Sequence, residues 1–249
     1  MPIESIVFAA PVIFLAYAVF GMTGFGAAVV AVPVLVQFMP LQFAVPLVVL
    51  FDLVCTALVG GSNWRHVALA ELKRLMPWMS LGIVVGVTLL HSAGARWPLM
   101  LLGGFVLVVC ARNLRGAKAA ARPPLRGRWA FPFGFFGGIF SALFGTGGPI
   151  YTIYLARQLS AIDQFRATAS VVILLSGVVR TMAFGAAGLY SQPGILWVAL
   201  ALVPASLAGL FAGSRLRSRV SPELLRRAIF ILLAVAGVGA IYRGWVSPA

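Results

Sequence analysis

Residues 129–159 form an apolar stretch that reads WAFPFGFFGGIFSALFGTGGPIYTIYLARQL and carries a glycine cluster inside it. A helix rises about 1.5 Å per residue, so these 31 residues would make a single helix of about 46 Å. That length is too great for one crossing of a hydrocarbon layer about 30 Å thick, and too small for two full crossings. A continuous helix also disfavours glycine at its centre. The stretch therefore predicts a broken or re-entrant pair of half-helices.

A second stretch of the same kind lies near the N-terminus. Residues 5–37 number 33 and would make a single helix of about 50 Å. Shifting the chain on itself by 121 residues places Gly24-Phe25-Gly26 on Gly145-Thr146-Gly147, and Gln37 on Gln158. We therefore predict an internal repeat. Residues 1–116 form the first transmembrane repeat, 117–128 a basic linker and 129–249 the second repeat.

The composition extends this prediction to the whole chain. Of 249 residues, 61% are hydrophobic and 10% are charged, against about 45–50% and about 25% in an average soluble domain. These values exclude a soluble globular enzyme. Six further segments fit the length of about 20 residues that one crossing needs; they are 43–62, 75–93, 97–111, 167–189, 194–213 and 225–246. The fold class is an all-α polytopic membrane protein with about eight hydrophobic segments, two of them broken or re-entrant.

The basic residues indicate how these segments cross the membrane. The chain has 19 Lys and Arg against 5 Asp and Glu, and most of them lie in the connections, as in cytoplasmic loops beside anionic lipid. This distribution favours membrane lipid over nucleic acid as the partner. If both long stretches crossed once, the two faces would hold ten and eight positive charges. If residues 129–159 enter and leave on one face, they hold sixteen and two, which is the bias that the positive-inside rule describes.

A double passage in both long stretches would give each half five passages. Five is an odd number, so the second half would be inverted relative to the first, as in many secondary transporters. We therefore predict two inverted repeats, with the linker 117–128 in the cytoplasm and both termini outside.

Both glycine motifs resemble those of a known family. The segment from Gly21 to Gly26 reads GMTGFG and is followed by Pro33, and the segment from Gly134 to Pro149 reads GFFGGIFSALFGTGGP. They are similar to motifs of the sulfite exporter TauE/SafE family, and the likeness spans nearly the whole chain. The resemblance implies a permease in a bacterial inner membrane that exports sulfite, a sulfonate or a related organic anion.

The chemistry of a broken helix also points to an anion. Backbone that leaves the helical path at membrane depth is tolerated only where protein or a watery cavity surrounds it. The N–H groups that begin the second half-helix carry the positive end of its dipole, which suits an anion. We predict that the two motifs bind an oxyanion through Thr23, Gly24, Phe25, Gly26, Gly145, Thr146, Gly147 and Gly148. The alternative is that these glycines only let helices approach closely, as expected of Gly82, Gly86, Gly209 and Gly213.

Two charged residues lie inside predicted spans, where a charge is costly and usually functional. Arg180 lies near the middle of 167–189, and its guanidinium could bind a sulfonate or carboxylate through two parallel hydrogen bonds. We predict that Arg180 binds substrate. Asp52 lies at the corresponding depth of 43–62. It could pair with Arg180, carry a coupling proton, or do both.

Other polar residues have two interpretations each. Gln37 and Gln158 could line the transport path or cap the ends of their half-helices. Tyr151 and Tyr154 could contact substrate or serve as interfacial anchors. The two histidines have no second histidine or carboxylate at metal-ligand spacing, so we expect no metal and no other cofactor.

These features together predict a secondary transporter of a small anion, working by alternating access around a midplane site between the two broken helices. An anion channel is the alternative, because sequence does not separate a path open at both ends from one that closes alternately. A membrane-embedded enzyme would need a nucleophile with its base, paired carboxylates or a metal set, and none is visible in the sequence. A passive membrane subunit would not need Arg180 and Asp52. Protons or another ion could drive transport, and an oligomer is compatible with the sequence.

Overall fold

The computed structural model describes residues 3–23, 26–60, 66–92, 96–114, 125–145, 147–216 and 222–246. Within these ranges the regular elements are helices, as predicted. They are α1 Ile3–Thr23, α2 Ala27–Leu35, α3 Leu41–Gly60, α4 Leu69–Ser92, α5 Arg96–Leu114, η2 Gly127–Trp129, α6 Ala130–Phe144, α7 Gly148–Gln158, α8 Ile162–Ala186, η3 Leu189–Ser191, α9 Ile195–Leu216 and α10 Pro222–Val246.

Four of the helices, α3, α4, α8 and α9, are long and apolar enough to cross a membrane. Shorter apolar runs lie in α1 and α5, over Val7–Met22 and Arg96–Val108, and α10 covers the predicted segment 225–246. Large apolar side chains cover the outside of the bundle; Trp197 is 77% exposed and Phe211 is 59% exposed. Apolar surface of this kind suits contact with lipid chains, so the protein is an integral membrane protein.

Each of the two long apolar stretches is divided into two helices at its glycine motif, as α1 and α2 in the first and as α6 and α7 in the second. The rings of Phe8 and Phe38 stack with their centroids 5.8 Å apart, which brings the start of α1 to the end of α2. The amide of Gln158 donates to the carbonyl oxygen of Leu125 at 2.8 Å, which brings the end of α7 to the segment before α6. The two ends of each stretch therefore lie side by side.

The two stretches differ in one respect from a pair of equal half-helices. α1 has 21 residues, whereas α6 has 15. The chain before α6 is the basic linker with Pro123-Pro124, and a proline pair does not continue a helix. The apolar residues that precede the first motif contain a single proline, Pro11, which lies inside α1, and α1 extends further from its motif than α6 does.

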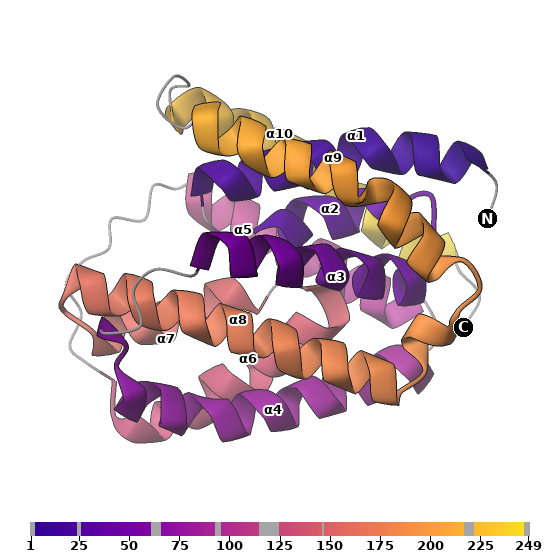
Figure 1. The fold of residues 1–249 in the computed structure, drawn as a ribbon. Coiled ribbons are helices and arrows are strands. Elements are labelled where there is room, and N and C mark those ends of the chain that lie inside the picture. Colours follow the sequence, from indigo (N-terminus) through magenta and orange to yellow (C-terminus); the bar gives the residue numbers. More distant parts are fainter. Residues whose placement is uncertain are drawn as a thin grey trace.

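The two most extensive helix pairs are related to each other by the 121-residue shift. α1 packs along α9, and α4 packs along α6, at opposite edges of the bundle (Figure 1). The shift takes α1 to α6 and α4 to α9, so it converts one pair into the other. α3 packs against α8 and α5 against α10, and in each of these pairs the two helices correspond to each other. Each half therefore contributes a long helix that packs on the broken helix of the other half.

Glycines allow the helix axes to lie close together in the pairs α1–α9 and α4–α6. A Cβ atom placed on Gly209 or Gly213 of α9 would fall onto the backbone of α1, and one placed on Gly82 or Gly86 of α4 would fall onto α6. Interfaces of membrane helices use glycine in this way because the backbones can then approach closely. The packing interpretation of these four glycines is confirmed.

The short helix α2 occupies the interior. All of its residues except Val34 are buried, and it contacts α1, α3, α5, α6 and α10. A helix of nine residues is too short to span a bilayer and can end inside the membrane only where protein surrounds it. This enclosure places α2, from its first residue onward, in the interior of the molecule.

Candidate functional site

A cavity of about 50 Å³ lies where the two broken helices meet. A single water needs about 10–15 Å³ by comparable measures, so the space suits a few waters or one small polyatomic ion. Its walls come from the starts of α2 and α7, the end of α6 and the middles of α3 and α8. Each residue that lines it in α3 corresponds under the 121-residue shift to one that lines it in α8: Asp52 to Ile173, Leu53 to Leu174 and Thr56 to Gly177.

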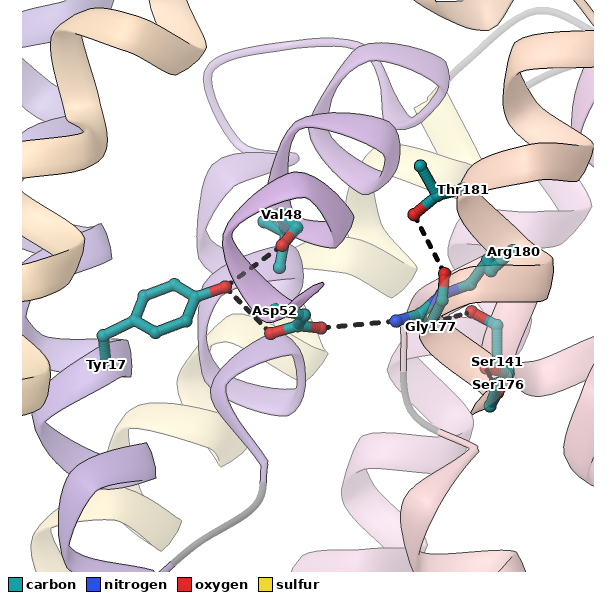
Figure 2. A network of polar contacts seen from close by, with 8 residues as sticks. All are labelled: Tyr17, Val48, Asp52, Ser141, Ser176, Gly177, Arg180 and Thr181. Atoms are coloured by element: carbon teal, nitrogen blue, oxygen red, sulfur yellow. Dashed lines mark hydrogen bonds and ion pairs between the residues drawn. The ribbon is translucent and has the colours of Figure 1, made fainter. Parts of the chain in front are cut away.

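Arg180 reaches the cavity from α8, and its side chain is 5% exposed. Its Nη1 donates to the carbonyl oxygen of Ser141 at 2.9 Å, and its Nη2 lies 3.5 Å from Oδ2 of Asp52 (Figure 2). Its Nε has no hydrogen-bond partner among the described residues. A tight charge-assisted pair measures about 2.7–2.9 Å, so the contact with Asp52 is loose. The guanidinium therefore retains capacity to bind a further acceptor.

Asp52 reaches the cavity from α3 and is held on its other side by Tyr17 of α1. The Tyr17 hydroxyl lies 2.8 Å from Oδ1 of Asp52 and 3.0 Å from the carbonyl oxygen of Val48. Tyr17 is fully buried, whereas the Asp52 side chain is 14% exposed. The chain Tyr17, Asp52, Arg180 thus links three helices, and Ser141 with Ser176 continues it at a separation of 2.9 Å between hydroxyl oxygens.

Two helix N-termini face the same cavity. Gly26 precedes the first residue of α2, Gly147 precedes that of α7, and both glycines line the cavity with the first residues of their helices. Within the described part of the chain, neither terminus is capped by a side chain. The first N–H groups of a helix have no intrahelical acceptor and carry partial positive charge. At α7 only part of this set is available, because Pro149 has no N–H and the N–H of Ile150 donates to the carbonyl oxygen of Gly147. Together with Arg180, the remaining N–H groups make the cavity suitable for an anion.

Gly145 ends α6 in the left-handed conformation, with φ 69°. A Cβ placed there would lie 2.6 Å from the Cβ of Ala28 in the first turn of α2 and 3.6 Å from Nη1 of Arg180. Glycine meets both requirements, because it adopts positive φ without steric cost and leaves room for the neighbouring helix. This position brings the end of α6 against the start of α2.

The predicted site residues fall into three groups. Gly26, Gly145, Gly147, Gly148, Asp52, Arg180 and Tyr151 all line the cavity. Gly24, Phe25, Thr146 and the side chain of Thr23 lie outside the described residues. The others, Gln37, Gln158 and Tyr154, are absent from the cavity walls. The Gln37 amide donates to the carbonyl oxygen of Pro33 at 3.2 Å, and the Tyr154 hydroxyl donates to Oε2 of Glu71 at 2.6 Å.

Sequence reasoning missed Tyr17, Ser141, Ser176 and Thr56. Two of them carried a usable signal, because Ser176 lies one helical turn before Arg180 and Thr56 one turn after Asp52, on the same helix faces. Ser141 lies four residues before Gly145, but only the break after α6 turns it toward the cavity. The segment around Tyr17 gives no sign of this role, which depends on its side chain reaching Val48 and Asp52 of α3.

Comparison with known proteins identifies the family of the chain. The profile of the family described as "Sulfite exporter TauE/SafE" matches residues 9–240. A relative from Comamonas testosteroni, "Probable inner membrane transporter protein TsaS", is 31% identical over 200 residues, which cover 80% of this chain and 83% of the relative. No solved structure matches the chain.

A second relative comes from Cupriavidus necator and is named "Probable sulfite/organosulfonate exporter TauE". It is 30% identical over 183 residues, which cover 72% of this chain and 67% of the relative. The resemblance noted in the glycine motifs is confirmed, and it excludes the alternative of an enzyme, because members of the family are transporters. The chain is a membrane transporter that belongs to the sulfite exporter TauE/SafE family.

Proposed function

We propose that this protein is a secondary carrier that exports a small sulfur-containing or organic anion, such as sulfite or a sulfonate, by alternating access. The observation that carries the proposal is the position of Arg180, a buried cation at a cavity that two uncapped helix N-termini also face. The substrate class is supported by the name of the relative from Cupriavidus necator.

The donor set suits an oxyanion with several oxygens. Arg180 lies at the cavity wall, and its Nη2 is only loosely held by Asp52. A guanidinium presents its donors in a planar fork that matches two oxygens of a sulfonate or carboxylate. The start of α2 supplies N–H groups from a further direction, and α7 adds the N–H of its first residue, since Pro149 at its second position has none. We place this site near the bilayer midplane, because residues near the middles of α3 and α8 line it, Asp52 in α3 and Ile173 with Leu174 in α8.

Alternating access would follow from two inverted repeats, residues 1–116 and 129–249, joined by the cytoplasmic linker 117–128. The correspondence of the pairs α1–α9 and α6–α4 under the 121-residue shift supports this arrangement. The adjacent ends of each long stretch support a double passage from one face. With sixteen positive charges inside, both termini lie outside a bacterial inner membrane.

Anion binding and flux test the proposal. Purified protein should gain thermal stability with sulfite, thiosulfate, sulfoacetate, taurine or methanesulfonate, because a ligand of the folded state stabilises it by mass action. Arg180→Ala should weaken the affinity about 10- to 100-fold, since a hydrogen bond to a charged group contributes about 1.5–3 kcal/mol and about 1.4 kcal/mol is tenfold. Arg180→Lys, which keeps the charge but loses the fork, should be less impaired.

Arg166→Ala is the matched control, because Arg166 is an exposed arginine in the first turn of the same helix. It should bind and transport the anion as the unaltered protein does. Equal affinity in Arg180→Ala and Arg166→Ala would refute the site. In proteoliposomes, unlabelled anion on the far side should accelerate uptake of labelled anion; the absence of this exchange would identify a channel instead of a carrier.

A further inference from the structure

The Tyr17 hydroxyl faces two acceptors with one proton. It lies 2.8 Å from Oδ1 of Asp52 and 3.0 Å from the Val48 carbonyl oxygen. A phenol has a single O–H to donate, so with an ionised Asp52 one of the two contacts lacks a proton. If Oδ1 of Asp52 carries a proton, it donates to the Tyr17 oxygen, and Tyr17 donates to Val48. Both contacts are then hydrogen bonds, with no change in the heavy-atom positions.

Arg180, which lies on the other side of Asp52 from Tyr17, is available to a competing anion. Oδ2 of Asp52 stands 3.5 Å from Arg180 Nη2, while Nη1 of the same guanidinium holds the Ser141 carbonyl at 2.9 Å. An arriving anion can therefore bind Nη2 of Arg180 without breaking a short ion pair. The carboxylate that it displaces would be left as a second negative charge at the cavity.

The balance of charge at the cavity determines whether the Asp52 carboxylate takes up a proton. Among the described residues that line the cavity, the charged side chains are Asp52 and Arg180, so the empty site is neutral. The titratable or charged groups that face Asp52 are Tyr17 on α1, Arg180 on α8 and Cys55 further along α3; α2 and α6 contain none. A monovalent anion would add an uncompensated charge in a medium of low dielectric, where it is costly.

We propose that the site binds a monovalent oxyanion together with one proton. The anion takes Arg180, Asp52 accepts the proton from solvent at Oδ1, and Tyr17 is the positioning residue that holds the protonated carboxyl by donating its own hydrogen to Val48. One O–H bond forms on Asp52, and no bond of the anion changes. The proposal rests on the proposed function, since it requires anion binding at Arg180.

Proton uptake during anion binding tests this coupling. Methanesulfonate is a suitable probe, because its sulfonate does not titrate near neutral pH and any proton taken up belongs to the protein. Calorimetry in two buffers of different ionisation enthalpy should give about one proton taken up per anion bound. In the pH range where Asp52 is ionised in the free protein, the affinity should fall about tenfold for each unit rise in pH. Infrared difference spectra should show a protonated carboxyl appearing on binding.

Substitutions test whether Asp52 is the residue that accepts the proton. Asp52→Asn should bind methanesulfonate with no proton uptake, no new carboxyl band and no dependence of affinity on pH. Tyr17→Phe should keep the uptake but move the midpoint of the pH profile upward by about one unit, because a hydrogen bond to a charged group is stronger than one to a neutral group. The carboxyl band should also shift, since the protonated Asp52 loses its acceptor. The control is Tyr154→Phe, which removes another hydroxyl from a carboxylate outside the cavity, and it should leave the uptake and the profile unchanged.

The outcomes separate the coupling from the proposed function. Anion binding that depends on Arg180 but takes up no proton would refute the coupling and leave the carrier proposal intact. So would uptake that persists in Asp52→Asn. A Tyr17→Phe profile identical to that of Tyr154→Phe would remove Tyr17 from the mechanism. If neither methanesulfonate nor sulfite binds the unaltered protein, the proposed function fails and the coupling fails with it. The infrared measurement on the unaltered protein keeps the test decisive even if a variant does not fold.

Discussion

Replacing Gly145 by alanine should destabilise the protein through two separable effects. Gly145 has φ 69° and ψ 8°, and an L-residue in this left-handed region costs about 1–2 kcal/mol. The new Cβ would also stand 2.6 Å from the Cβ of Ala28. Forcing extra volume into a packed interior costs about 1–3 kcal/mol. The sum predicts that Gly145→Ala lowers the free energy of unfolding by about 2–5 kcal/mol.

Gly188 supplies a matched control for the first effect. It has φ 70° and ψ 12°, close to the values of Gly145, but a Cβ placed on it would meet nothing within 4 Å. Gly188→Ala should therefore cost only the conformational part, about 1–2 kcal/mol. The difference between the two variants measures the overlap with Ala28. Equilibrium unfolding in mixed micelles with increasing SDS gives both free energies.

Removing the Cβ of Ala28 tests the second effect, the overlap of the new side chain with α2. In the background of Ala28→Gly, the cost of Gly145→Ala should fall to that of Gly188→Ala, which corresponds to a coupling of about 1–3 kcal/mol in a double-mutant cycle. Anion affinity should change less than stability, because the new Cβ would lie at an ordinary contact distance of 3.6 Å from Arg180 Nη1. A coupling near zero would refute the close approach of α6 to α2 at the cavity.

Two further predictions concern helix packing and topology. Gly213→Ala should destabilise the protein, because its Cβ would fall onto the backbone of α1; Gly185→Ala, on the open face of α8, should be neutral or stabilise by up to about 1 kcal/mol, and equal unfolding free energies would contradict the packing. In a cysteine-free protein, single cysteines at positions 127 and 218 should react with an impermeant thiol reagent only from the cytoplasm, and one at 191 only from outside. Labelling of 127 and 218 from opposite faces would refute the double passage of residues 129–159.

Much of the fold follows from local properties of the sequence, and the helix pairing does not. Apolar length predicts where helices run, and the glycine motifs of the two over-long stretches predict where α1 and α6 end. Which helix packs on which depends on how surfaces of nearly equal hydropathy fit together. The pairs α1–α9 and α4–α6 use glycines spaced four residues apart, and that spacing identifies an interface without naming its partner.

Part of the candidate site could likewise be predicted from the sequence, and part depends on helix packing. Arg180 and Asp52 could be singled out from the sequence because a charge inside an apolar segment has few uses other than a functional one. Their separation of 3.5 Å, which makes the pair loose, depends on how α3 and α8 pack. Tyr17 lies among apolar residues that give its hydroxyl no apparent purpose. Only the approach of α1 to α3 supplies the two acceptors that give it one.

The repeat supplies a symmetric frame, but the charges at the cavity do not follow the symmetry. Under the 121-residue shift, Asp52 corresponds to Ile173 and Arg180 to Val59. If each half carried both charges, or the same charge, the cavity would hold two like charges or two competing pairs at short range. One charge from each half leaves the empty cavity neutral, so a carrier can reorient it across the hydrocarbon without moving net charge, which is the costly step in a bilayer. Binding a monovalent anion together with a proton keeps the loaded cavity neutral as well. The departure from symmetry at these two positions is therefore what the proposed coupling requires, because both directions of the cycle then proceed without net charge at the site.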